Sequence, residues 1–311
     1  MMVPAALLLL GALAAVVAPR LLARAGWPDH EPVVALWVWQ CVVAAVILCC
    51  ALSMTLSAAA AWQAVRGHVF ASAPHAVVEA YALRTTGPWA AATAVTLACA
   101  GVWSGAMLVR EVVRARAGRR QRRAELLVRA PLLPGEGPVG GQLVVLEGER
   151  ADAWWLSGPA PQLVVTTAAL RRLKGRQLDA VLAHEQGHAR ARHDWLLHCS
   201  AALAGGFPQV PVFAAFRDEM HRLVELAADD TASRRHGRLT TALALVELNE
   251  DRGVFGPSPT TRTHVPQRVH RLLTPPARLT RARRVSLTAT AALAPAVPVL
   301  VAFVPGLRAL G

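Results

Sequence analysis

Charged residues are scarce in this 311-residue sequence: they make up 17% of it, whereas soluble globular proteins carry about 25%. Hydrophobic residues make up 54%. This composition excludes an ordinary soluble domain and also a disordered chain, which would be poor in apolar residues. Because the apolar residues are concentrated in long runs near the two ends, the sequence predicts membrane segments around one polar domain.

Lysine is almost absent, since Lys174 is the only one, and arginine therefore carries nearly all of the formal net charge of +13. The arginines stand beside apolar runs rather than along the polar domain, which argues against direct binding of nucleic acid. The five cysteines include no CxxC pair and lie in apolar surroundings. A disulfide scaffold is excluded, and the cysteines are interpreted as small buried hydrophobic residues.

Four apolar segments are predicted to cross the membrane as helices. Three lie within residues 1–118, at about 3–22, 33–61 and 88–109, and the fourth, at 285–305, lies within residues 285–311. Each has at least the roughly 20 residues that a helix needs to cross about 30 Å of hydrocarbon. The first segment has an alternative interpretation as a cleaved signal peptide, but it lacks a basic N-terminal region and further apolar segments follow it.

Seven arginines crowd the chain directly after the third predicted span, between residues 110 and 123. Positive charge beside a span is retained on the cytoplasmic side of the membrane. The sequence therefore predicts a multi-pass protein of the cell membrane whose polar domain, residues 119–284, is cytoplasmic. The alternative role of this cluster is to bind acidic lipid or a partner protein.

The polar domain contains a metal-binding pattern, HEQGH, at residues 184–188. Residues 177–192 are predicted to form a helix, on which His184 and His188 stand four residues apart and share one face. Glu185 lies about 100° around that helix and can reach a water on the metal. The pattern also occurs by chance, and the alternative is a solvated charged helix face.

A catalytic zinc site needs three protein ligands and one open position. Glu225 is predicted to be the third ligand, because it begins the sequence ELAAD in a stretch of helical spacing. Asp229 shares a face with Glu225 and is expected to hydrogen-bond a ligand histidine and fix its tautomer. The alternative for Glu225 is an exposed helix carboxylate.

The apolar stretch 195–216 lies between the histidines and Glu225. A single crossing would separate His188 from Glu225 by about 30 Å of hydrocarbon, while zinc holds its ligands at about 2 Å. A helical hairpin against the membrane or on the spans is therefore predicted.

A small sheet is predicted before the metal-binding pattern. Its strands are residues 142–147 and 162–166, with AWWL at 153–156 between them. The substrate is expected to bind along an edge strand between residues 153 and 166.

The sequences HEQGH, Arg192-His193-Asp194 and ELAAD together resemble the integral-membrane gluzincin metallopeptidases. Three spans before the catalytic domain and one after it resemble the BlaR/MecR-type antibiotic-sensing branch, whereas the HtpX and CaaX-prenyl-protease type usually has two before and two after. The stretch from His264 to Val269 is similar to the HPxxxRI-like stretch that closes these domains. The resemblance places His264 near the catalytic cleft, where it is expected to stabilise an oxyanion.

The predicted fold is an α-helical membrane protein with four transmembrane helices and an inserted, mainly helical (α+β) zincin-like metalloprotease domain. The predicted function is zinc-dependent cleavage of a cytoplasmic or membrane protein in regulatory signalling. In it, His184, His188 and Glu225 bind Zn²⁺, and Glu185 takes a proton from water and passes it to the leaving amine.

The resemblance to the BlaR/MecR branch implies a BlaI/MecI-type repressor as one substrate. Because no extracellular penicillin-binding domain follows Pro305, direct β-lactam sensing is not expected. Two alternatives remain open: an HtpX-like quality-control protease and a non-catalytic, BlaR-like signal transducer.

Overall fold

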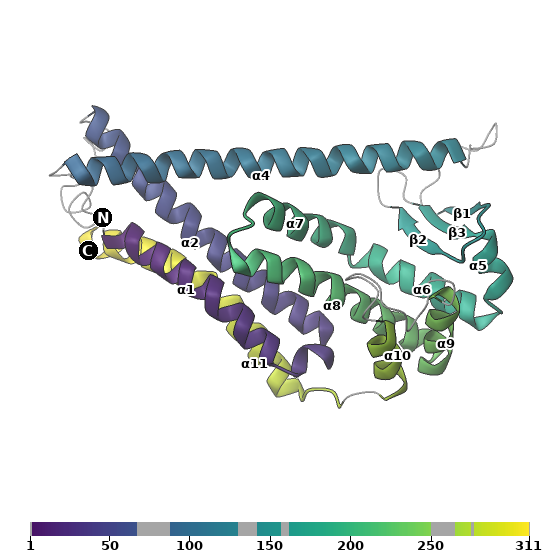
Figure 1. Cartoon of the computed structure of the whole chain (residues 1–311). Helices are drawn as coiled ribbons and strands as arrows, with labels where there is room; N and C mark the ends of the chain where they lie inside the picture. The colour runs from purple at the N-terminus through teal and green to yellow at the C-terminus, as the bar shows by residue number, and fades with distance from the viewer. Residues whose placement is uncertain are drawn as a thin grey trace.

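The computed structural model describes residues 2–66, 88–129, 142–156, 162–249, 265–274 and 277–310 (Figure 1). Three long apolar helices come first. They are α1 (Met2–Arg24), α2 (Pro32–Arg66) and α4 (Pro88–Arg129), with the short 3-10 helix η1 (Trp27–Asp29) between α1 and α2. Each contains a stretch that is long and apolar enough to cross a membrane, and these stretches are Val3–Arg24, Pro32–Ala60 and Val95–Gly118. The apolar N-terminal helices indicate that the protein associates with a membrane.

Helix α2 packs closely along α1, and small residues set the distance between them. A Cβ atom at Gly11 of α1 would lie 2.9 Å from the Cβ atom of Cys49, so only glycine fits there without displacement. Ser53 of α2 donates a hydrogen bond of 3.0 Å to the carbonyl of Pro4. All five cysteines are free, and Cys41 and Cys49 are buried as expected, whereas Cys99 on α4 is exposed.

Helix α4 continues well past the span predicted at residues 88–109 and ends at Arg129. The arginine-rich stretch after Arg110 contains no proline, and most of its residues favour helix, so nothing in it ends the helix. The second half of α4 runs alongside α7 and, in the view of Figure 1, ends above the small sheet. The basic cluster is thus part of one long helix.

The apolar stretch 195–216 forms a helical hairpin made of α7 (His193–Gly206) and the first turns of α8 (Pro211–His236). Helix α7 packs on α4, and α8 packs on α2. Trp39 of α2 and Phe213 and Phe216 of α8 are buried in this contact, and they belong to the largest apolar core of the described residues. The hairpin therefore packs on the apolar helices. Its second helix, α8, leads back to α6, against which it packs.

The sheet has three short strands, β1 (Gln142–Leu146), β2 (Ala153–Leu156) and β3 (Gln162–Thr166), in the order β1-β3-β2. Strand β1 is parallel to β3, and β2 is antiparallel to β3 and forms an edge. Three helices complete this part of the fold: α5 (Thr167–Arg172), α6 (Arg176–Arg190) and α9 (Arg238–Asn249). Val165, Ala169 and Val181 are buried in the core they share.

The C-terminal region does not form the single helix predicted at residues 285–305. After α10 (Val265–Leu273), the chain forms α11 (Arg281–Leu293) and α12 (Ala296–Leu310), which are bent by 43° at the break between them. Pro295 stands in this break, where it has no N–H to donate and its ring crowds the preceding turn. Both helices pack on α2. The described residues therefore hold three helices able to cross a membrane, or four if the bent pair makes one span.

The contact at Gly11 gives a test of the packing of α1 on α2. We expect Gly11→Ala to destabilise the protein by about 1–3 kcal/mol, because the added methyl group meets the Cβ atom of Cys49. Gly105→Ala on α4 is the matched control, since a Cβ atom there meets nothing within 4 Å and alanine favours helix by up to about 1 kcal/mol. Unfolding of the detergent-solubilised variants measures both, and equal stability of the two would contradict this packing.

Candidate metal centre

The site is built where α6 packs against α8. Gly187, inside HEQGH, makes the approach possible: a Cβ atom there would lie 3.3 Å from the Cβ atom of Thr231 and 3.5 Å from the Cα atom of Ala228. Thr231 and Ala228 belong to α8, on which Glu225 and Asp229 stand one turn apart. The close contact brings the carboxylates of α8 to the face of α6 that carries His184 and His188.

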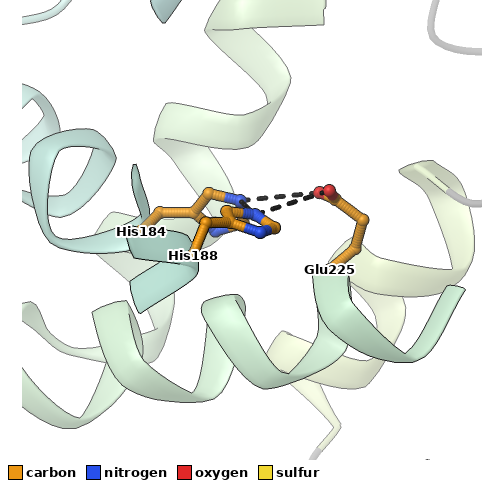
Figure 2. A group of neighbouring side chains, drawn as sticks. All are labelled: His184, His188 and Glu225. Atoms are coloured by element: carbon orange, nitrogen blue, oxygen red, sulfur yellow. Dashed lines mark hydrogen bonds and ion pairs between the residues drawn. The ribbon is translucent and has the colours of Figure 1, made fainter. Parts of the chain in front are cut away.

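Three donor atoms meet between the two helices (Figure 2). His184 Nε2 lies 3.1 Å from His188 Nε2, and each imidazole has an Nε2 atom 3.5 Å from a carboxylate oxygen of Glu225. Donor atoms around a tetrahedral zinc ion with bonds of about 2.0–2.1 Å stand about 3.3 Å apart. The two imidazoles and one carboxylate therefore fit zinc in both donor type and spacing, and they are the one such group found among the described residues.

Each histidine has a hydrogen-bond partner at its Nδ1 atom, the ring nitrogen that does not belong to the donor cluster. Asp229 is 1% exposed, and its Oδ1 atom accepts from His184 Nδ1 at 3.1 Å. His193 is the hydrogen-bond partner of His188, with 2.9 Å between the two Nδ1 atoms. The backbone of Arg192 makes this possible, because this residue follows the end of α6 and its left-handed conformation (φ 52°) turns the chain directly into α7. Both Nε2 atoms are thereby directed at the donor cluster.

Arg268 of α10 is a functional residue to which the sequence analysis gave no role, as it gave none to His193. Its guanidinium donates to both carboxylate oxygens of Asp229 at 2.7 Å and to Glu225 at 2.8 Å. The signal for it was present, because two carboxylates on one buried helix face need a cation and Arg268 lies in the stretch that resembles HPxxxRI. His264, the residue chosen from that stretch, lies outside the described residues.

The charges fix the protonation of the carboxylates. Burial alone would raise their pKa values, but Arg268 and His184 lower the pKa of Asp229 to about 2 and hold that of Glu225 well below its usual range. Burial alone would also lower the pKa of His184, but hydrogen bonds to Asp229 and Glu225 raise it to about 10. Both carboxylates are therefore ionised at neutral pH and attract a cation.

Glu185 faces a different neighbour from the other acids of the site. Its Oε2 atom accepts a hydrogen bond of 3.0 Å from the backbone N–H of Trp155 in β2. Burial, as the largest cause, raises the pKa of Glu185 to about 7. A carboxylate that titrates near neutral pH can both take and give a proton, which is the property of a general base and acid.

Two cavities open beside the donor cluster. The smaller, of about 190 Å³, is lined by His184, Glu185, Glu225 and Arg268. The larger, of about 890 Å³, is lined by His188 together with residues of α2, α4 and α7. The donor cluster therefore borders both cavities.

A helical domain that presents two helix-borne imidazoles, a carboxylate from a second helix and an adjacent acid defines a metallopeptidase type of site. The comparison of sequences agrees with this class, because residues 114–286, more than half of the chain, match peptidase family M48. The chain belongs to this family of metallopeptidases. No curated protein and no solved structure matches it.

The hydrogen bond between Asp229 and His184 gives a test of the centre. We expect Asp229→Asn to weaken zinc binding about 10- to 100-fold, because an amide in place of the carboxylate removes the charged support of the imidazole. Asp230→Asn is the matched control, since the next residue on α8 pairs with Arg271 instead. Competition with a coloured chelator measures both affinities. An equal loss in the two variants would show that the effect is one of general stability.

Proposed function

We propose that this chain is a membrane-anchored zinc endopeptidase in which His184, His188 and Glu225 bind the ion. The observation that carries the proposal is the cluster of three donor atoms, 3.1–3.5 Å apart, in a chain of peptidase family M48. Bound zinc supplies a Lewis acid that lowers the pKa of water toward about 7. The chain's own residues do the rest of the chemistry.

Glu185 is proposed as the general base. It takes a proton from the attacking water and delivers it to the amine nitrogen that leaves when the peptide bond breaks. Its raised pKa, about 7, suits both transfers. Asp229 and His193 act as positioning residues, because they hold the imidazoles of His184 and His188 in place.

The substrate is proposed to bind as an added strand along β2. This strand forms an edge of the sheet, and the N–H of Trp155 points away from β3, toward Glu185. A polypeptide that pairs with this edge is held by backbone hydrogen bonds, so its main chain passes close to the Glu185 carboxylate. Asp152 and Ala153, at the start of β2, line the smaller cavity with Glu185 and Glu225.

The substrate is proposed to be a cytoplasmic or membrane protein that is cut in regulatory signalling, with a BlaI/MecI-type repressor as one candidate. The order of the elements supports this role, because three apolar helices precede the catalytic residues and one bent pair follows them. Cleavage of damaged membrane proteins, as in the HtpX type, would use the same site, and substrate trapping separates the two roles.

Replacing the base tests the catalytic assignment. We expect Glu185→Gln to lower the cleavage rate by about 10²- to 10⁴-fold while the zinc content stays at one ion per chain, because no ligand is removed. Glu219→Gln on α8 is the control, since this acid pairs with Arg222 away from the donors. Metal analysis accompanies an assay of peptide cleavage. Retained cleavage in Glu185→Gln would assign the base elsewhere.

The same variant also identifies substrates, because it binds them without cutting. One dominant trapped protein would support the regulatory role, and a broad set of membrane proteins would support quality control. A wild-type protein that cuts none of the proteins trapped by its own variant would support the non-catalytic transducer instead.

The catalytic domain is proposed to face the cytoplasm, on account of the arginine cluster of α4. We expect a reporter fused at residue 140 to report the cytoplasmic side. A reporter fused after residue 311 is expected to report the opposite side, which requires the bent pair α11–α12 to act as one span. Reports from the same side would show that this pair enters the membrane and returns. A report from outside at residue 140 would overturn the orientation itself.

A further inference from the structure

The larger cavity, of about 890 Å³, is joined to the proposed active site. His188, His193 and Trp155 line it on the catalytic side. His188 belongs to the donor cluster, and Trp155 contacts Glu185 through its backbone. A polypeptide paired with β2 would therefore pass from Glu185 across His188 into this cavity. Its volume lies within the range of about 300–1,000 Å³ that is typical of ligand sites.

One wall of the cavity is apolar. It consists of the first turns of α2, with Val33, Leu36 and Trp37, and the start of α7, with Trp195 and Leu196. Helix α2 contains a candidate membrane span that begins at residue 32, so this wall is the end of a membrane segment. Trp37 and Trp195 are 45% and 64% exposed, as expected of tryptophans at a membrane–water interface. The cavity thus lies at the border between the apolar helices and the catalytic domain.

The opposite wall is positively charged. Arg116 and Arg120 stand one turn apart on α4, and Arg192 lies at the junction of α6 and α7. In the described part of the chain no carboxylate forms an ion pair with Arg116 or Arg120, whereas Arg114 on the same helix pairs with Glu111 at 2.8 Å. Asp194 is the one acid in the lining and takes part in an interaction of its own. The cavity therefore offers three exposed arginines, two of them on α4, to whatever enters it.

We infer that this cavity binds the part of the substrate that lies beyond the scissile bond on the His188 side, and that it selects a polypeptide segment combining an acidic side chain with apolar ones. Arg116 and Arg120 are the specificity-determining residues. The inference rests on the proposed function. A polypeptide is favoured over an anionic lipid because the cavity is continuous with His188 and with the edge of the sheet.

The test uses the full chain with zinc in nanodiscs of phosphatidylcholine. Peptides matched except for one Glu or Gln, placed at successive positions beside the scissile bond, are assayed for cleavage. We expect kcat/KM to be about tenfold higher for Glu at one or two positions on one side, since an exposed arginine pair gives a modest gain. In the double variant Arg116→Gln/Arg120→Gln, this difference between the two peptides should disappear.

The matched control is the double variant Arg110→Gln/Arg114→Gln. It makes the same change of charge on the same helix, at residues that do not line the cavity, and should keep the preference for Glu. Equal cleavage of Glu and Gln peptides by the wild-type protein would overturn the inference. So would loss of the preference in the control pair.

Binding separates a failure of the inference from a failure of the proposed function. A fluorescent Glu peptide should bind the Glu185→Gln protein about tenfold more tightly than its Gln counterpart, and Arg116→Gln/Arg120→Gln should remove this gap. A wild-type protein that shows this binding pattern but cuts nothing would refute the peptidase function while supporting the cavity. A second set of nanodiscs, with phosphatidylglycerol added, tests the lipid alternative. If the arginine pair governs binding of phosphatidylglycerol and not of the peptide, the inference is overturned in favour of lipid.

Discussion

The bidentate contact of Arg268 with Asp229, extended by a third bond to Glu225, is the interaction on which the geometry of the site depends. The carboxylates of buried Asp229 and partly buried Glu225 stand one turn apart and repel each other, and a charge left unpaired in the interior is costly by several kcal/mol. Arg268 offsets this repulsion with three bonds from one planar group. With Asp229 fixed, His184 is fixed too, so the guanidinium orients an imidazole that it does not touch.

The helix that carries this arginine also joins the site to the apolar helices. One turn after Arg268, Arg271 pairs with Asp230 of α8 and donates to the backbone of Asp29 in η1, between α1 and α2. Asp29 in turn pairs with Arg222 of α8. The catalytic helices are thereby fastened to the link between the first two apolar helices, so the site and the membrane segments are parts of one packed structure.

Local spacing explains how much of the site the sequence predicts. His184 and His188, and likewise Glu225 and Asp229, stand four residues apart, so the geometry of a helix places each pair on one face without knowledge of the fold. The contact from Asp229 to His184 follows from the chemistry of zinc ligands. Arg268, in contrast, acts 39 residues away from Asp229, and no local rule connects them. The support from His193 depends on the backbone of Arg192, whose left-handed conformation a bulky arginine rarely adopts.

The same contrast holds for the fold. Apolar length alone predicts the three N-terminal helices, but the end of α4 depends on the absence of a breaker in the polar stretch that follows, which hydropathy does not measure. At the C-terminus hydropathy continues through Pro295 while the helix does not, so one expected helix is two. Apolar composition sets which segments avoid water, and backbone hydrogen bonding sets where a helix ends.

The contacts of Arg268 also set the charge balance of the centre. When Glu185 is ionised as well, the carboxylates of Glu185, Glu225 and Asp229 against the guanidinium of Arg268 leave a net charge of −2, which a divalent cation neutralises. Without the ion, protons supply part of that charge, because the pKa of His184 is raised to about 10 and that of Glu185 to about 7. The metal ion and protons therefore compete to neutralise the same excess of negative charge. Each ion that binds displaces protons from the residues that hold it or act beside it.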